Sequence, residues 1–153
     1  MPGPPPLRPF GLVLHHDGRW SHDGQPIRNR RLREHFDRSV QYLTDECKYV
    51  VTLRHFRGEV EVEEAGFFVR AIDGDRGLVH LSDGTEEPLV TGSLRLSPRD
   101  GALLCTVKRH LRPGGLPARF EHAAQAELLQ LAKETPDGPA LRLAGSLYPL
   151  PEL

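Results

Sequence analysis

Cysteine is scarce in this chain, which has only Cys47 and Cys105 in 153 residues. Neither has a Cys-x-x-Cys or Cys/His spacing around it, so the sequence indicates neither a zinc site nor a disulfide framework. The first nine residues lack the apolar stretch of a secretory signal. No run approaches the roughly 20 apolar residues that span a bilayer. We therefore expect a cytoplasmic protein with reduced thiols and no membrane insertion.

An excess of charge of either sign is also missing. The chain carries 20 Lys and Arg against 21 Asp and Glu, for a formal net charge of −1. This balance argues against DNA binding through bulk electrostatics, although it leaves room for a local basic patch. The length suits one domain or two small halves that share a core.

Several motifs of catalysis and cofactor binding are absent as well. The sequence has no Gly-x-Ser-x-Gly, no glycine-rich phosphate loop and no His-Glu-x-x-His. We expect no cofactor, and the sequence favours a binding module over an enzyme. Cys47 would serve as a nucleophile only beside a histidine and an oxyanion hole, which no local pattern supplies.

The pattern that is present begins with a hairpin over residues 10–27. Residues 1–9 are rich in proline and predict a disordered leader. Alternating apolar residues then lead to the turn at Asp17-Gly18, and the return strand carries Trp20, which we expect to be buried. Asn29 is a good N-cap for a helix that the apolar spacing predicts as far as Leu43.

The rest of the chain predicts two similar halves, at residues 10–74 and 75–153. Strands are expected over 48–55, 59–64 and 67–72 as an antiparallel meander, and further strands over 93–96, 102–110 and 140–150. Pro117 suits the first position of a second helix that ends before Asp137. Gly77-Leu78-Val79 with Asp83-Gly84 repeats Gly11-Leu12-Val13 with Asp17-Gly18 at an offset of 66, which hints at duplication. The fold class is therefore α+β, with antiparallel strands and one helix in each half.

Four motifs in order give the chain a family resemblance. They are DGRW-SHDGQPI with the helix LREHFDRSV, then Val62-Glu63-Glu64-Ala65-Gly66-Phe67, Leu116-Pro117-Ala118-Arg119, and Ala144-Gly145-Ser146-Leu147-Tyr148-Pro149-Leu150. Together they resemble a bacterial family, domain of unknown function 1285, over roughly residues 10–150. The resemblance implies a duplicated α+β core with a C-terminal half similar to a pleckstrin-homology-like barrel. It also implies a ligand groove between the halves, with a regulatory or signalling role.

Basic side chains are the strongest candidates for binding. Arg28 and Arg31 lie at the start of the first helix, and Arg119 is expected at the start of the second, with Arg109 shortly before it. Guanidinium forks and helix N-termini both suit anions, so we expect an anionic or nucleotide-like small molecule between the halves. The full expected ligand-binding set is Trp20, His22, Arg28, Arg31, Glu63, Arg109 and Arg119. Ordinary solvated arginines remain the alternative.

Two other constellations leave alternatives open. His15, His16 and His22 with Asp17 and Asp23 could hold a metal, but the aspartates also suit plain turns, and we expect no metal. The row Glu59, Glu61 and Glu63 falls on one strand face, where it could do acid–base work or merely keep the strand soluble. The alternative functions are a metal-dependent or carboxylate-based enzyme and a protein–protein adaptor.

Overall fold

The computed structural model describes residues 7–54 and 56–153, which fall into two compact units. The first unit ends at Gly66 and the second is Phe67–Leu153, whereas the sequence placed the junction at residues 74 and 75. Residues 1–6 of the expected leader and His55 of an expected strand lie outside the described residues. Leu7, Arg8 and Pro9 pair with the strand that contains Arg57 to Glu59, so these three residues are strand rather than leader.

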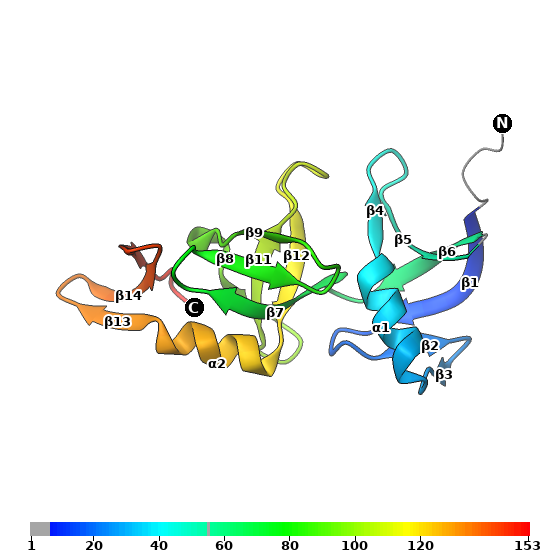
Figure 1. Cartoon of the computed structure of the whole chain (residues 1–153), viewed down its shortest axis with the longest axis horizontal. Helices are drawn as coiled ribbons and strands as arrows, with labels where there is room; N and C mark the ends of the chain where they lie inside the picture. Colours follow the sequence, from blue (N-terminus) through cyan, green and yellow to red (C-terminus); the bar gives the residue numbers. More distant parts are fainter. Residues whose placement is uncertain (1–6, 55) are drawn as a thin grey trace. The chain divides into compact units, whose positions relative to one another are not determined.

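A six-stranded sheet forms the first unit, in the order β3-β2-β1-β6-β5-β4 (Figure 1). Its strands are β1 Leu7–Leu14, β2 Trp20–His22, β3 Gln25–Pro26, β4 Gln41–Leu43, β5 Lys48–Leu53 and β6 Phe56–Val62. All neighbours are antiparallel except β1 and β6, which run parallel at the centre. The expected α+β class with mostly antiparallel strands is confirmed, and the one parallel pair arises because α1 and the four other strands lie between β1 and β6 in the chain.

Helix α1, Arg30–Ser39, packs on one face of this sheet. The Asn29 side chain accepts a hydrogen bond from the Leu32 amide, which confirms the predicted N-cap. Phe36 is buried against Trp20, which is itself only 1% exposed, as expected. The helix ends before Val40 rather than at Leu43, because the next residues pair with β5 as strand β4.

The second unit repeats the topology of the first. Its sheet has the order β10-β11-β12-β7-β8-β9, again with one parallel pair, β7 and β12, at the centre. The strands are β7 Phe67–Asp73, β8 Leu78–Leu81, β9 Glu86–Pro88, β10 Arg95–Leu96, β11 Leu103–Val107 and β12 Leu116–Phe120. The 3-10 helix Thr91–Ser93 stands where α1 stands in the first unit. This sheet curls into a half-barrel, which agrees with the expected barrel-like C-terminal half (Figure 1).

The duplication is present, but the repeat seen in the sequence has a different register. Asp17-Gly18 lies between the first and second strands of its unit, whereas Asp83-Gly84 lies between the second and third. The structural counterpart of Asp83-Gly84 is Asp23-Gly24, which also follows the second strand. Strand β7 likewise does not continue the meander of β5 and β6, because it pairs with β8 and β12 instead.

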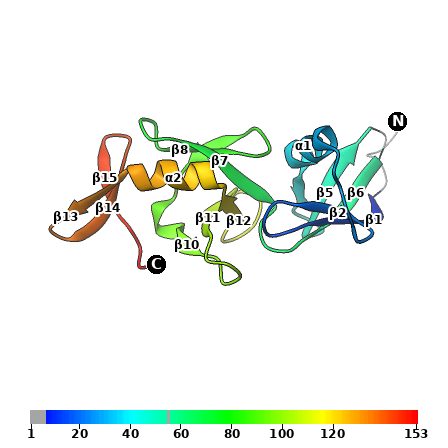
Figure 2. The same cartoon turned by 90° about the horizontal axis from the view of Figure 1, so that it is seen from below.

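The second helix begins at His122, five residues after the predicted start at Pro117. Residues 116 to 120 form β12 with alternating burial, and α2 is His122–Gln130, preceded by Glu121 at the N-cap. After α2 comes a separate three-stranded sheet of β13 Ala132–Thr135, β14 Gly138–Leu143 and β15 Ser146–Pro149 (Figure 2). The single strand expected over 140–150 is thus a hairpin that turns at Ala144-Gly145. No helix in the described part of the chain is long and apolar enough to cross a membrane.

Candidate functional site

Glu63 and two histidines form a cluster at the ends of the two central strands of the first unit. His15 and His16 directly follow β1, and Glu63 directly follows β6. Parallel pairing of β1 with β6 places these strand ends side by side, and the Glu63 amide donates to the Leu14 carbonyl at 3.1 Å. The backbone therefore holds the carboxylate next to both imidazoles.

The Glu63 carboxylate accepts three hydrogen bonds within this cluster. Oε1 receives the His16 amide at 2.9 Å and His16 Nδ1 at 3.1 Å, and Oε2 receives His15 Nδ1 at 3.1 Å. These bonds, led by the one from the His16 amide, lower the pKa of Glu63 to about 2. Glu63 is therefore ionised near neutral pH, although its side chain is 30% exposed.

The chain of hydrogen bonds extends beyond His15 to Ser21. His15 Nε2 lies 2.9 Å from Ser21 Oγ on β2. An ionised carboxylate can only accept, so His15 Nδ1 donates to Glu63, and in the neutral imidazole Nε2 then accepts the hydrogen bond of the Ser21 hydroxyl. The cluster is thus an ordered series of serine, imidazole and carboxylate. The sequence indicates His15 as a candidate metal ligand and Glu63 for acid–base work, but it has no signal for their contact or for the position of Ser21.

Arg28 and Arg31 lie at the start of α1, as predicted, and both are exposed. Neither has an acidic partner among residues 7–54 and 56–153, whereas the neighbouring Arg30 donates to Glu34 at 2.9 Å. The first turn of α1 contains no acidic residue. The positive end of the helix dipole and these guanidinium groups are therefore uncompensated by nearby carboxylates.

The two other expected site residues of the first unit have different surroundings. Trp20 donates its Nε1 proton to Asp37 Oδ1 at 2.8 Å, and its ring centroid is 5.2 Å from that of Phe36. Trp20 is therefore part of the core of this unit. His22 is exposed on β2, with Nε2 3.4 Å from Asp23 Oδ2, and it lies outside the hydrogen bonds that join His15, His16 and Glu63.

Arg109 and Arg119 belong to the second unit. Arg109 follows β11 and is exposed. Arg119 lies on β12 rather than at a helix start, and its guanidinium donates two hydrogen bonds to the Asp100 carboxylate, at 3.1 and 2.7 Å. The prediction that Arg119 opens the second helix is therefore wrong, because the alternating burial of β12 continues to Phe120. A groove that takes side chains from both units stays a prediction.

A buried ion pair in the second unit was not anticipated. Lys108 Nζ lies 2.8 Å from Asp83 Oδ2, and the two side chains are only 10% and 11% exposed. The ammonium also donates to Thr85 Oγ1 at 3.1 Å and lies 4.9 Å from the centroid of the Phe67 ring. Burial would raise the pKa of Asp83, but the bonds from Lys108 and Thr85 outweigh it and lower that pKa. This arrangement ties the β8–β9 turn to the end of β11.

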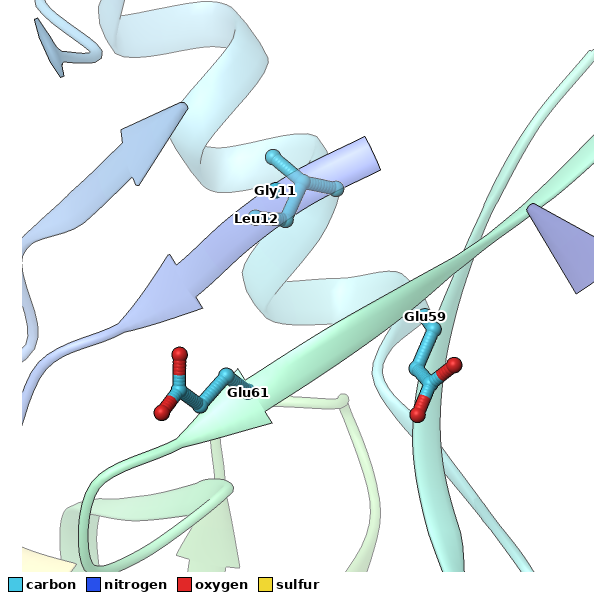
Figure 3. A pocket seen from close by; sticks show the side chains of 4 residues that line it. All are labelled: Gly11, Leu12, Glu59 and Glu61. Atoms are coloured by element: carbon cyan, nitrogen blue, oxygen red, sulfur yellow. The ribbon is translucent and has the colours of Figure 1, made fainter. Parts of the chain in front are cut away.

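A shallow acidic pocket of about 420 Å³ lies on the first sheet, lined by Gly11, Leu12, Glu59 and Glu61 (Figure 3). The two glutamates share this pocket, which agrees with the expectation that they fall on one strand face. Glu59 is 3.7 Å from Lys48 Nζ, and both side chains are well exposed. Glu63, the third member of that row, is held by the histidines instead.

Metal ligands and thiols are the remaining groups in the described residues that could carry chemistry. No group of three His, Cys, Asp or Glu side chains among them has the arrangement of a metal site. The two cysteines are free thiols. Burial raises the pKa of Cys105 to about 12, so this thiol stays protonated and weakly nucleophilic. Cys47 is exposed, and its Sγ lies 3.8 Å from the Thr44 carbonyl.

Two solved structures share this architecture. A DUF1285 family protein from Silicibacter pomeroyi DSS-3 is 19% identical, with a TM-score of 0.62 over 95% of this chain and 82% of that one. A DUF1285 family protein from Shewanella baltica OS155 is 15% identical, with a TM-score of 0.51 over 78% of this chain and 91% of that one. No family model and no curated protein matches the sequence. The expected resemblance is therefore confirmed at the level of the fold.

Proposed function

We propose that this chain, which shares the fold of the two DUF1285 proteins, is a ligand-binding module with a regulatory or signalling role. Its ligand is an anionic or nucleotide-like small molecule. The observation that carries the proposal is the start of α1, where Arg28 and Arg31 are exposed without an acidic partner in the described chain. That Arg109 and Arg119 of the second unit contribute to the same ligand site remains a prediction.

Physical chemistry favours an anion at this position. A helix N-terminus has unpaired amides and the positive end of the helix dipole. Arginine side chains at this end repel the positive end of the dipole instead of compensating it. A phosphate or carboxylate group would offset both, and a guanidinium can bind its oxygens in a bidentate manner. Asn29 already accepts the Leu32 amide, so the ligand would meet the arginine side chains and the remaining amides.

A thermal-shift screen of nucleotides and anionic metabolites, followed by calorimetry, tests the proposal. A ligand at about 100 times its dissociation constant adds about 2.7 kcal/mol to the stability of the folded state. We expect Arg31→Gln and Arg28→Gln each to weaken binding by 1.5–3 kcal/mol, or about 10- to 150-fold. Affinity should also fall with added salt, because screening acts over about 8–10 Å at ordinary ionic strength.

Arg30→Gln is the matched control, because it removes the same charge from the same helix turn. The Arg30 side chain is already engaged by Glu34, so its loss should change affinity little. Equal affinity in the wild type, Arg28→Gln and Arg31→Gln would refute the proposed site. Failure of every anion to bind would leave the adaptor function ahead.

A further inference from the structure

The Ser21, His15 and Glu63 series has the contacts of a nucleophile, a base and the group that orients the base. Ser21 Oγ lies 2.9 Å from His15 Nε2, and His15 Nδ1 lies 3.1 Å from Glu63 Oε2. The same order of contacts activates serine in hydrolases of unrelated folds, where it is recognised by geometry rather than by sequence position. Here the order in the chain is histidine, serine and then glutamate.

The fold itself does not require this series, as the second unit shows. Glu121 takes the position of Glu63, because its amide donates to the Val69 carbonyl as the Glu63 amide donates to Leu14. Arg70 follows Val69 as His15 follows Leu14, and its Nε lies 3.7 Å from Glu121 Oε1. A guanidinium stays protonated and cannot accept a proton from serine. The second unit therefore has a glutamate and a neighbouring arginine at these positions, but it has no base that could accept the proton of a serine.

The serine position makes the same contrast. Leu14 pairs with Trp20, and Val69 pairs with Leu81, so the residues that follow, Ser21 and Ser82, correspond. The hydroxyl of Ser82 accepts the Phe68 amide at 2.9 Å, which is a structural bond. Ser21 Oγ instead meets an imidazole. At this repeated position, Ser82 bonds to the backbone in the second unit, whereas Ser21 bonds to the imidazole of His15 in the first unit.

We propose that Ser21, His15 and Glu63 form an acyl-transfer centre in the first unit, with Ser21 as the nucleophile. His15 is the general base and Glu63 the positioning residue that fixes its tautomer. The His15 and Glu63 side chains are 25% and 30% exposed, so the centre opens to solvent on their side. Ser21 is only 7% exposed, so we expect that only a small ester reaches its hydroxyl.

The reaction balances without any group beyond the ester and water. His15 Nε2 takes the hydroxyl proton as Ser21 Oγ bonds to the acyl carbon, and the alcohol leaves with the electron pair and that proton. Water then gives a proton to His15 while its oxygen bonds to the acyl carbon. Ser21 Oγ departs with the electron pair and recovers the proton, which releases the carboxylic acid.

A small fluorophosphonate ester, applied to the full chain and followed by peptide mass spectrometry, tests the proposal. We expect one adduct, on Ser21, together with slow hydrolysis of p-nitrophenyl acetate. The labelling rate should rise with pH, because only a neutral imidazole can accept the hydroxyl proton. An adduct found only on other residues of the folded wild type, or no adduct at all, overturns the proposal whatever the variants do.

Three variants separate catalysis from structure once circular dichroism shows that they fold. Ser21→Ala should abolish both the adduct and the hydrolysis. His15→Gln should lower the labelling rate by about 100-fold or more, the lower end of what a general base contributes. Ser39→Ala, a serine of α1 that donates to the Phe36 carbonyl, should react like the wild type. Labelling of His15→Gln at the wild-type rate, or without any pH dependence, contradicts the role of the base.

Discussion

Glu63 and Glu121 occupy the same position in the two units. Each directly follows the last strand of its six-stranded sheet, and each donates its amide to a carbonyl of the neighbouring parallel strand, Leu14 at 3.1 Å and Val69 at 3.0 Å. Their side chains differ in use. Glu63 accepts bonds from His15 and His16, whereas the carboxylate of Glu121 lies 3.7 Å from Arg70 Nε and makes no capping bond to α2. One backbone position therefore supports two different electrostatic arrangements.

The first prediction concerns Glu63, whose folded-state pKa of about 2 lies below the ordinary value of 4.5. A depressed carboxyl pKa contributes stability that is fully present above about pH 4.5 and is lost as pH falls toward 2. We expect Glu63→Gln to lower the free energy of unfolding by about 1–2 kcal/mol at pH 7, since solvent reaches part of the group. The difference in free energy of unfolding between the wild type and Glu63→Gln should become smaller as pH falls from about 4.5 to 2.

Urea unfolding at a series of pH values measures this effect. Glu61→Gln is the control, because Glu61 lies two residues away on β6 and is exposed. Its loss should change the free energy of unfolding by less than about 0.5 kcal/mol at every pH. A Glu63→Gln deficit that stays constant down to pH 2 would show that packing, and not the charge, holds the cluster together.

Local signals in the sequence gave correct predictions where the physics is local. The Asn29 cap and the burial of Phe36 follow from side chains within one or two turns of the same helix. The turn at Asp17-Gly18 was also readable, because glycine accepts the positive φ of 94° that it has there. These features need no knowledge of distant residues.

The errors arose where two signals competed or where partners are distant in sequence. Residues 116 to 120 alternate in burial as a strand does, whereas Pro117 is typical of the first residue of a helix. The contact of His15 with Glu63 spans 48 residues and depends on the parallel pairing of β1 with β6, for which the sequence has no local mark. The sequence therefore indicates His15, His16 and Glu63 as separate candidates, whereas their contact and the position of Ser21 follow only from the fold.

The second prediction concerns Trp20. Its ring is buried against Phe36, so Trp20→Ala should lower the free energy of unfolding by about 3–5 kcal/mol. Trp20→Phe keeps much of the ring but removes the bond to Asp37, and it should cost less. Intrinsic fluorescence should shift to the red when the wild type unfolds in urea. A native spectrum already at the wavelength of the unfolded chain would contradict the burial.

The third prediction concerns metals. The His15 and His16 side chains both bond to the Glu63 carboxylate, and no described group of three ligands has the arrangement of a metal site. We expect EDTA to leave the melting temperature of the freshly purified protein unchanged. Elemental analysis of the same preparation serves as the parallel measurement. A drop in melting temperature with EDTA that zinc restores would instead establish a metal centre and favour the metal-dependent enzyme.

The last prediction concerns the buried pair of Lys108 and Asp83, whose atoms Nζ and Oδ2 are 2.8 Å apart. Removal of one partner leaves the other charge buried without its counter-ion, which usually costs about 3–5 kcal/mol. We expect Lys108→Met to lower the free energy of unfolding by that amount. Arg109→Met, at the exposed next residue, should change it by less than about 0.5 kcal/mol.

A double-mutant cycle distinguishes loss of the ion pair from loss of packing at Lys108. Asp83→Asn keeps an oxygen that can accept from Thr85, so it removes the charge while preserving the turn. If the two charges are coupled, the double variant Lys108→Met with Asp83→Asn should lose less free energy of unfolding than the two single variants together. The difference should be about 0.5–3 kcal/mol. Strict additivity would mean that the ion pair contributes nothing and that other contacts of Lys108, such as that of its ammonium with the Phe67 ring, account for the effect.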